Sequence, residues 1–369
     1  MSFERSDSIK SDENRSMSID KNQIEENYKS EIKENTFYPW IKPNSKCHKL
    51  QGMLKLHYEI LDFYDFIKLN KEEIELREKT FNYIKNIIED NYPDFTCKLY
   101  GSYKTGLSLP NSDIDILIYP KDEYNEKYIE IMNNKKLLID SLEKIYYFFL
   151  EQNTFSLLER VIAKVPIIKC IYKETNIHID ICLFEKNGDL AIPFIEKIIK
   201  VYPEIRPLML ILKYTLRQRK LNEIYTGGVS SFIIFSLLYY YLTDLKKRRY
   251  YNKNNGKEEE ILTLGDILLG FLNFYGFEFN YSKLGISINN GCFLYKRKEK
   301  EKFILSIKNF QEPNQELGKS CYKFKYVIDT FKLARDCIYY PDIPVVSYLK
   351  GFILEDDILR KRAQKNKSI

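Results

Sequence analysis

Residues 99–120, LYGSYKTGLSLPNSDIDILIYP, contain a glycine–serine pair followed by two aspartates that alternate with isoleucines. The alternation of Asp113 and Asp115 with apolar residues is the period-two pattern of a β-strand. Both carboxylates therefore leave one face of the strand, while the isoleucines pack behind the other. Two acids on the polar face of a half-buried strand repel each other and resist desolvation, so such a pair usually needs cations.

The glycine–serine pair, Gly101 and Ser102, follows a short apolar run from Thr96 to Tyr100. A turn of this kind offers backbone N–H groups and a hydroxyl to phosphate oxygens. An Asp-x-Asp motif alone is weak evidence, because most such motifs are solvated acids at strand ends. With the preceding glycine and serine, the motif indicates metal-assisted phosphoryl transfer.

A third acid, Asp180, lies in the segment Asn176–Leu183, NIHIDICL. Alternating apolar residues place Asp180 on the polar face of this second strand, together with His178. A site for two metal ions commonly needs three carboxylates. The sequence therefore predicts that Asp113, Asp115 and Asp180 are catalytic residues and metal ligands.

These motifs resemble the DNA polymerase β nucleotidyltransferase superfamily. The segments TFYPWI, EEIELREKTFNYIKNII, RVIAKVPIIK, LNEIYTGGVSSF and LGDILLGFLNFYG are similar to the noncanonical nuclear poly(A) polymerases of the TRAMP type. The similarity runs from about Phe37 to about Cys337. It implies an α+β protein in which a small α/β nucleotidyltransferase domain and a mostly helical central (PAP-associated) domain enclose the catalytic cleft.

The resemblance also implies a division of the chain. We expect a disordered N-terminal tail, a segment that packs with the central domain, a catalytic domain, the helical domain and a basic C-terminal tail. Their expected ranges are 1–36, 37–70, 71–190, 191–345 and 346–369.

Hydrophobic periodicity predicts the individual elements. Strands are expected over 96–100, 158–165, 165–172 and 176–184. Helices are expected over 50–69, 72–90, 128–152, 192–202, 206–220, 230–245, 264–275 and 326–338. The polar composition of residues 250–260 predicts a loop.

Two cations in the predicted helix over 206–220 are candidate phosphate ligands. Lys213 and Arg217 are four residues apart and share a helix face. A solvated basic face is the plainer explanation of this spacing. The resemblance favours contact with the triphosphate, because Lys213 matches the triphosphate-binding lysine of the family.

The segment GGVSSF, residues 227–232, opens the next predicted helix. Its free N–H groups suit phosphate, although glycine and serine also begin helices that bind no ligand. The resemblance implies that Ser231 contacts phosphate, with Ser230 beside it, and that Phe232 stacks on the base.

Residues 307–322, IKNFQEPNQELGKSCY, resemble the nucleotide-recognition loop of the family, where Asn and Arg contact the purine. Those positions hold Gln315 and Lys319 here, and lysine lacks the planar fork of arginine. Uridylyl-selective relatives use a histidine in this loop, whereas no histidine follows His178 in this chain. Adenylyl transfer is therefore favoured, with uridylyl or mixed nucleotidyl transfer as the alternative.

The function that the resemblance implies is template-independent addition of AMP from ATP to RNA 3′ ends, with two Mg²⁺ or Mn²⁺ ions. It implies a nuclear role in RNA surveillance and exosome-linked decay, with a zinc-knuckle RNA-binding protein and an RNA helicase as partners. The chain has no RRM, KH or zinc-knuckle signature of its own, so weak intrinsic RNA binding is expected. An inactive scaffold is a further alternative, which the three intact carboxylates disfavour.

Composition fits this interpretation. Of the 369 residues 44% are hydrophobic and 30% are charged, as in soluble proteins of two modest domains. The net charge of +6 is uneven, because residues 1–36 contain 6 Lys/Arg against 9 Asp/Glu. A basic body suits a polyanionic partner. The seven cysteines form no C-x-x-C pair, and neither a signal peptide nor a membrane-spanning segment is evident, so a soluble intracellular protein with reduced thiols is expected.

Overall fold

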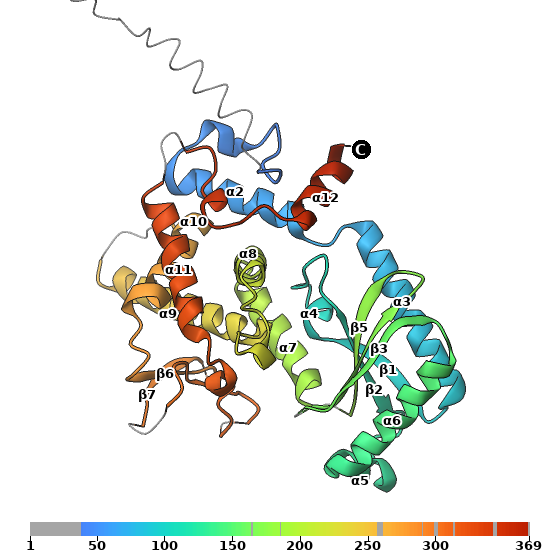
Figure 1. The fold of residues 1–369 in the computed structure, drawn as a ribbon. Helices are drawn as coiled ribbons and strands as arrows, with labels where there is room; N and C mark the ends of the chain where they lie inside the picture. The colour runs from blue at the N-terminus through green and yellow to red at the C-terminus, as the bar shows by residue number, and fades with distance from the viewer. Residues whose placement is uncertain are drawn as a thin grey trace, which may run out of the picture. The chain divides into compact units, whose positions relative to one another are not determined.

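The computed structural model describes residues 38–163, 165–184, 186–256, 261–289, 291–298, 302–312, 314–341 and 345–367. The predicted tail over 1–36 lies outside these residues. From Pro39 onward the chain forms one compact unit. Within it, a five-stranded sheet with its helices precedes a set of helices and a three-stranded sheet, as Figure 1 shows.

The larger sheet holds the predicted aspartates. Its strand order is β1-β2-β5-β4-β3, with β2 and β5 parallel and the other neighbours antiparallel. The strand predictions are confirmed, with ends that differ by a few residues. The strands are β1 (Phe95–Tyr100), β2 (Ile114–Pro120), β3 (Phe155–Val161), β4 (Ile167–Tyr172) and β5 (Ile177–Leu183).

One face of this sheet is a hydrophobic core. The isoleucines of β2 and β5 at positions 114, 116, 118, 179 and 181 are buried against α3 (Lys71–Asn91) and α6 (Lys135–Glu151), which flank the sheet in Figure 1. Burial of each such side chain contributes about 1.5–3 kcal/mol. The alternation along the strands therefore fixes the aspartates on the opposite face.

The helix predicted over 128–152 is wrong in one respect, because it is two helices. It is divided into α5 (Glu126–Asn133) and α6 at Asn134. The Asn134 side chain accepts from the N–H groups of Lys136 and Leu137 and so caps a new helix.

The other half is mainly helical, as the periodicity predicts. Its helices are α7 (Lys186–Val201), α8 (Ile205–Gln218), α9 (Ser231–Asn254), α10 (Leu264–Asn273), α11 (Phe324–Tyr339) and α12 (Asp357–Lys367). A small sheet of β6 (Leu284–Ser287), β7 (Phe293–Lys296) and β8 (Ile307–Lys308) lies in the same half. The prediction of a loop over 250–260 is wrong for residues 250–254, which are helical. Helix α9 continues to Asn254, beyond its buried first half.

Helix α2 (Gly52–Ile67) packs with this helical half, although it precedes the large sheet in sequence. The Phe63 and Tyr214 rings meet edge to face with centroids 5.8 Å apart. The N–H of Leu264 donates to Nδ1 of His57 at 3.1 Å. The chain therefore begins the helical half, leaves it to build the large sheet, and returns through α7.

The end of the chain is also tied to this half. In the region expected as a tail, Leu349, Phe352 and Leu359 are buried, and Arg362 forms an ion pair with Glu73 of α3. Burial of these apolar residues attaches the segment 346–367 to the rest of the folded chain, despite its basic composition. No helix among the described residues has the length and apolar character needed to span a membrane.

Candidate active site

The structure brings the three predicted carboxylates together. Asp115 of β2 lies opposite Asp180 of β5 in the parallel register. Asp113 precedes β2 by one residue and shares the face of Asp115. All three therefore occupy the face of the sheet opposite the isoleucine core.

A lysine that the sequence analysis missed lies among these acids. Lys169 of β4 is opposite Asp180 in the antiparallel register, so both side chains share a face. Its ammonium donates to the two Asp180 carboxylate oxygens at 3.0 and 2.8 Å, and it lies 3.8 Å from Asp113 Oδ2. The sequence analysis predicted β4 and β5 as a hairpin, and the register of this hairpin could have identified Lys169 as the neighbour of Asp180.

The carboxylates are crowded and poorly solvated. Burial raises the pKa of Asp115 to about 7, and repulsion by Asp180 and Asp113 adds to the rise, while Lys213 and Lys169 oppose it. Burial also raises the pKa of Asp180, against the lowering effect of Lys169. The cluster is therefore short of positive charge.

This donor set suits hard divalent cations. Carboxylate oxygens are the ligands that Mg²⁺ and Mn²⁺ prefer. Within the described ranges, no three His, Cys, Asp or Glu side chains are arranged to chelate a metal ion as they stand. The Lys169 ammonium pairs with Asp180 and lies near Asp113, where it supplies part of the positive charge that these acids require. The chemistry of the cluster therefore fits divalent metal binding.

Gly101 lies directly against this cluster. It begins α4 (Gly101–Lys104) with a φ of +68°, and a Cβ added there would meet Asp115 Oδ2 at 2.0 Å. Only glycine tolerates both this backbone conformation and this approach. The predicted phosphate turn thus touches the predicted metal ligand.

A cavity of about 290 Å³ opens beside the turn. It brings together Gly101 and Ser102 with Ser231 and Phe232, four of the predicted nucleotide-binding residues, from distant parts of the sequence. Its other lining residues are Tyr100, Thr105, Leu107, Ala191, Ile192, Ile195, Met209, Phe235, Asn309, Gln311 and Leu317. The Phe232 ring stacks with Phe235, with centroids 6.1 Å apart.

The two predicted cations lie on α8 but outside the lining of this cavity. Lys213 is buried, and its ammonium donates to the carbonyl of Leu107, a lining residue, at 2.7 Å. Burial lowers the pKa of Lys213 to about 8, against the effect of Asp115. Burial likewise lowers the pKa of Arg217, while the charges of Asp356 and Asp113 act in the opposite direction.

Three further predicted nucleotide-binding residues are also absent from the lining of this cavity. Ser230 is the N-cap of α9, and its hydroxyl accepts from the N–H of Ile233 at 3.2 Å. Gln315 accepts through its side chain from the amide of Asn309 at 2.5 Å. Lys319 is exposed in a turn over Leu317–Ser320.

Asn309 and Gln311, which the sequence analysis missed, occupy the lining instead. In the sequence, the two polar residues of the segment NFQ, residues 309–311, could have indicated that this part of the loop contacts the nucleotide. The backbone carbonyl of Gln315 also accepts from the Asn309 N–H at 3.1 Å. Gln315 therefore fixes the position of Asn309 without itself lining the cavity.

Arg77 of α3 is a further residue that the sequence analysis missed. It is buried, and it donates to the carbonyls of Pro110 and Ser112 at 2.6 and 3.3 Å. These bonds hold the loop that leads into Asp113. A separate cavity of about 330 Å³ is lined by Arg77, Asn111, Asp113 and His178, among others.

Comparison with protein families places these features in a known group. Residues 56–201 match the model of the central palm domain of mitochondrial-like poly(A) RNA polymerases. Residues 263–316 match the model described as Cid1 family poly A polymerase. The chain therefore contains, over residues 56–201 and 263–316, the two domains that these poly(A) RNA polymerase family models describe.

The relatives within the family are proteins named as poly(A) RNA polymerases. Protein 2 of Saccharomyces cerevisiae is 32% identical over 76% of this chain and 47% of its own length. The cid14 protein of Schizosaccharomyces pombe is 29% identical over 74% of this chain and 39% of its own. The chain thus spans about half or less of the length of these relatives. A Drosophila melanogaster relative, 27% identical over 80% of this chain and 71% of its own, is named as inactive.

Solved structures of the family share this fold. The polymerase core of TRAMP, described as an RNA surveillance complex, has a TM-score of 0.73, with 25% identity over 87% of this chain and all of its own. A point mutant of the Cid1 poly(U) polymerase bound to MgATP has a TM-score of 0.66, with 18% identity over 82% of this chain and 99% of its own. The α+β architecture predicted from the sequence is therefore confirmed.

Proposed function

We propose that the chain is a template-independent poly(A) polymerase that adds AMP from ATP to RNA 3′ ends. The observation that carries the proposal is the cavity in which Gly101 and Ser102 face Ser231 and Phe232, in contact with the Asp115 side of the carboxylate cluster. A phosphate turn, a base platform and paired acids are the parts that nucleotidyl transfer needs. Similarity to proteins named as poly(A) RNA polymerases supports adenylate as the nucleotide.

In the proposed reaction the RNA 3′-hydroxyl oxygen forms a bond to the α-phosphorus of ATP. The bond between that phosphorus and the oxygen of the leaving pyrophosphate breaks, and the hydroxyl proton passes to Asp180. Two divalent ions held by Asp113, Asp115 and Asp180 would supply electrostatic stabilisation of the transferred phosphoryl group.

The remaining side chains bind and orient the nucleotide. The hydroxyls of Ser102 and Ser231 would donate to the β- and γ-phosphates, and the charge of Lys213 would oppose that of the leaving pyrophosphate. Phe232 would stack on the base. The side-chain amides of Asn309 and Gln311 lie in the lining where hydrogen bonds to a base edge can select among nucleotides.

The RNA end is proposed to enter on the Asp113 side. The cavity of about 330 Å³ on that side is lined by Arg77, Asn111, Asp113 and His178, among others.

We further propose a nuclear role in RNA surveillance, with a zinc-knuckle RNA-binding protein and an RNA helicase as partners. Similarity to the polymerase core of TRAMP supports this role.

A tailing assay tests the reaction. A labelled short RNA would be offered ATP, UTP, CTP or GTP separately, with Mg²⁺ or Mn²⁺. A ladder with ATP alone is expected, and a ladder with UTP or with all four nucleotides would replace adenylyl transfer by the alternative.

A matched pair of variants ties the ladder to the site. Asp113→Ala should abolish it, while Asp140→Ala, which removes an exposed acid of α6, should not. Full activity of folded Asp113→Ala would contradict the proposed role of the carboxylates. If the folded wild-type chain gives no ladder even when a zinc-knuckle partner is added, this chain is an inactive scaffold.

A further inference from the structure

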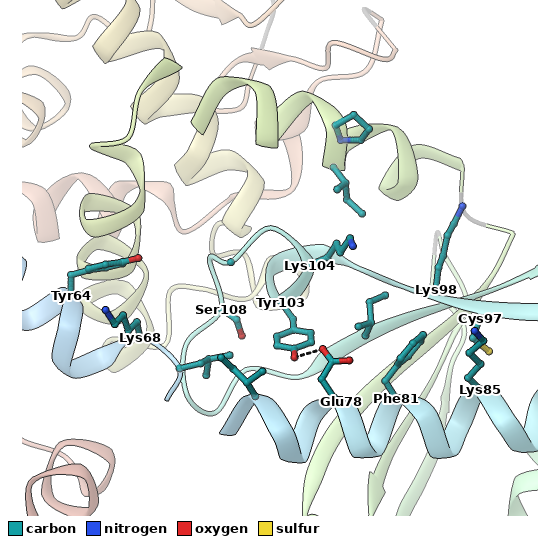
Figure 2. A pocket seen from close by; sticks show the side chains of 16 residues that line it. Tyr64, Lys68, Glu78, Phe81, Lys85, Cys97, Lys98, Tyr103, Lys104 and Ser108 are labelled. Carbon is teal, nitrogen blue, oxygen red and sulfur yellow. Dashed lines mark hydrogen bonds between the residues drawn. The ribbon is translucent and has the colours of Figure 1, made fainter. Parts of the chain in front are cut away.

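A groove of about 880 Å³ runs along β1, on the outer edge of the large sheet. Figure 2 shows Glu78, Phe81 and Lys85 of α3 on one side of it and Tyr64 and Lys68 of the α2 end at one extremity. Ile192 and Pro193 of α7 complete its lining. Of the lining residues that the structure describes, the groove shares only Ile192 with the nucleotide cavity.

The backbone of β1 presents unpaired polar groups to this groove. The carbonyl of Ile118 in β2 accepts from the N–H of Phe184 and so faces β5. Because backbone groups alternate along a strand, Leu117 faces β1, and Lys98, which lies opposite it, faces β2 in return. The next residues on either side, Cys97 and Leu99, therefore direct their N–H and C=O groups away from the sheet.

Both of these residues line the groove. Among the described residues, none forms a hydrogen bond with the outward backbone groups of Cys97 or Leu99. An open strand edge of this kind is a template for pairing with another extended chain. The six residues of β1 span about 20 Å, which is enough for a short strand.

The floor of the groove is apolar. Ile74 of α3 is 41% exposed, and Phe81 and Leu99 are half-buried. Side chains on one face of an added strand would cover these residues. Among the described residues of the lining the only acid is Glu78, which already accepts a hydrogen bond from the Tyr103 hydroxyl at 2.7 Å.

Four lysines rim this floor, at positions 68, 85, 98 and 104. Lys98 lies over the Tyr119 ring at 4.3 Å, and Lys104 is exposed on α4 without an ion pair to any described residue. The lysines at 68 and 85 pair with Asp65 and Glu89 outside the groove, at 2.6 and 3.9 Å. Exposed pairs of this kind are weak and exchange readily for another carboxylate.

We propose that this groove binds an extended, acidic peptide segment of a partner protein, which adds to β1 as a further strand. Backbone pairing with Cys97 and Leu99 supplies affinity, and acidic side chains meet the lysine rim. A single-stranded RNA would use the lysines but leave the strand edge unpaired, and its phosphates would approach Glu78. The inference concerns a binding surface and is independent of the proposed catalytic function.

The test uses the full chain and a fluorescein-labelled peptide that alternates Asp or Glu with Val. The control peptide has the same sequence, with N-methyl groups on the amides of one edge, so its charge is kept and its strand pairing is blocked. Binding is measured by fluorescence anisotropy, with a labelled oligo(A) as a second probe. The protein variants are Lys98→Glu/Lys104→Glu and the matched control Lys136→Glu/Lys144→Glu, which changes exposed lysines of α6 outside the groove lining.

We expect the acidic peptide to bind the wild-type chain, and to bind at least about tenfold more weakly when N-methylated or when Lys98 and Lys104 are reversed in charge. The α6 variant should bind as wild type. Hydrogen exchange should slow at the amides of Cys97 and Leu99 on binding, and this readout needs no variant.

Three results would overturn the proposal. They are equal binding of the N-methylated peptide, absence of binding to the wild-type chain, and oligo(A) binding that needs Lys98 and Lys104 while the peptide does not bind. The last result would assign the groove to RNA.

Discussion

At the scale of single residues, the site depends on close contacts that a small change disrupts. Gly101 lies so close to Asp115 that a methyl group added at its Cα would overlap the carboxylate. Lys213 is buried, and its ammonium donates to the carbonyl of Leu107 next to the phosphate turn. Two predictions follow from these contacts, one steric and one electrostatic.

Gly101→Ala should lower the tailing rate by about 100-fold or more, because a displacement of about 1 Å at a reacting group has an effect of this size. The new Cβ would meet Asp115 Oδ2 at 2.0 Å and push the carboxylate away. Gly256→Ala is the matched control, since Gly256 also has a positive φ of +74° but nothing within 4 Å of an added Cβ. Steady-state tailing rates measure both, and equal losses would assign the effect to backbone strain.

Lys213 should make the use of ATP sensitive to alkaline pH. Its pKa is lowered to about 8 by burial, so in the free protein the ammonium keeps its proton only below about pH 8. Above that value kcat/KM for ATP should fall by about tenfold per pH unit. A profile that stays flat to pH 9 would remove Lys213 from triphosphate binding.

At the scale of elements, the parallel pairing of β2 and β5 forces Asp115 and Asp180 together, and the pairing of β4 brings Lys169 to them. The strands position charges that would separate in an unfolded chain. Burial, together with repulsion by Asp180 and Asp113, raises the pKa of Asp115 from 3.8 to about 7.

The stability of the metal-free protein should therefore depend on pH through Asp115. A carboxyl whose folded pKa is raised contributes stability that is complete below pH 3.8 and is lost as pH rises through about 7. Asp115→Asn should then unfold at a higher temperature than wild type at pH 8 without metal. Mn²⁺ should raise the unfolding temperature of wild type and have a smaller effect on the variant. A lower unfolding temperature of the metal-free variant at pH 8 would contradict this account.

The segment over 307–322 should select the base through its first residues. Asn309 lines the nucleotide cavity, whereas Lys319 is exposed outside it. Asn309→Ala should change the ratio of kcat/KM for ATP and UTP by about tenfold, the usual effect of one hydrogen bond to a substrate. Lys319→Ala should leave the ratio unchanged. The opposite pattern would restore the sequence-based assignment of Lys319.

At the scale of the whole molecule, segments far apart in sequence meet at Glu59 of α2. This buried carboxylate accepts from Trp40 Nε1 at 3.0 Å and from the N–H groups of Tyr348 and Leu349 at 2.8 and 3.3 Å. It therefore joins the start of the described chain to its end.

Glu59→Leu should lower the free energy of unfolding by about 3–5 kcal/mol, because it leaves several buried donors without an acceptor. Urea unfolding measures the loss, and Glu151→Leu, at an exposed position of α6, should change it by about 0.5 kcal/mol or less. A change at Glu59 no larger than that at Glu151 would show that this hydrogen-bond cluster has little energetic weight.

The sequence by itself determined the strands that carry Asp115 and Asp180 and placed Asp113 just before the first of them. Alternation of apolar and polar residues is a local property of the chain, which is why it could be read without the fold. Local periodicity also predicted most of the helices. It failed where the determinant was a single cap, as at Asn134, or a helix that continues beyond its buried part, as in α9.

Only the tertiary structure decided which side chains meet across distant segments. Lys169, Arg77 and Asn309 reach the two cavities and the acids through strand register and loop packing, which depend on pairings between residues far apart in sequence. The same packing turned Ser230 into a helix cap and left Lys319 in solvent. The physical reason is that a residue's type limits its chemistry, while burial and neighbours set by the fold decide whether that chemistry is used.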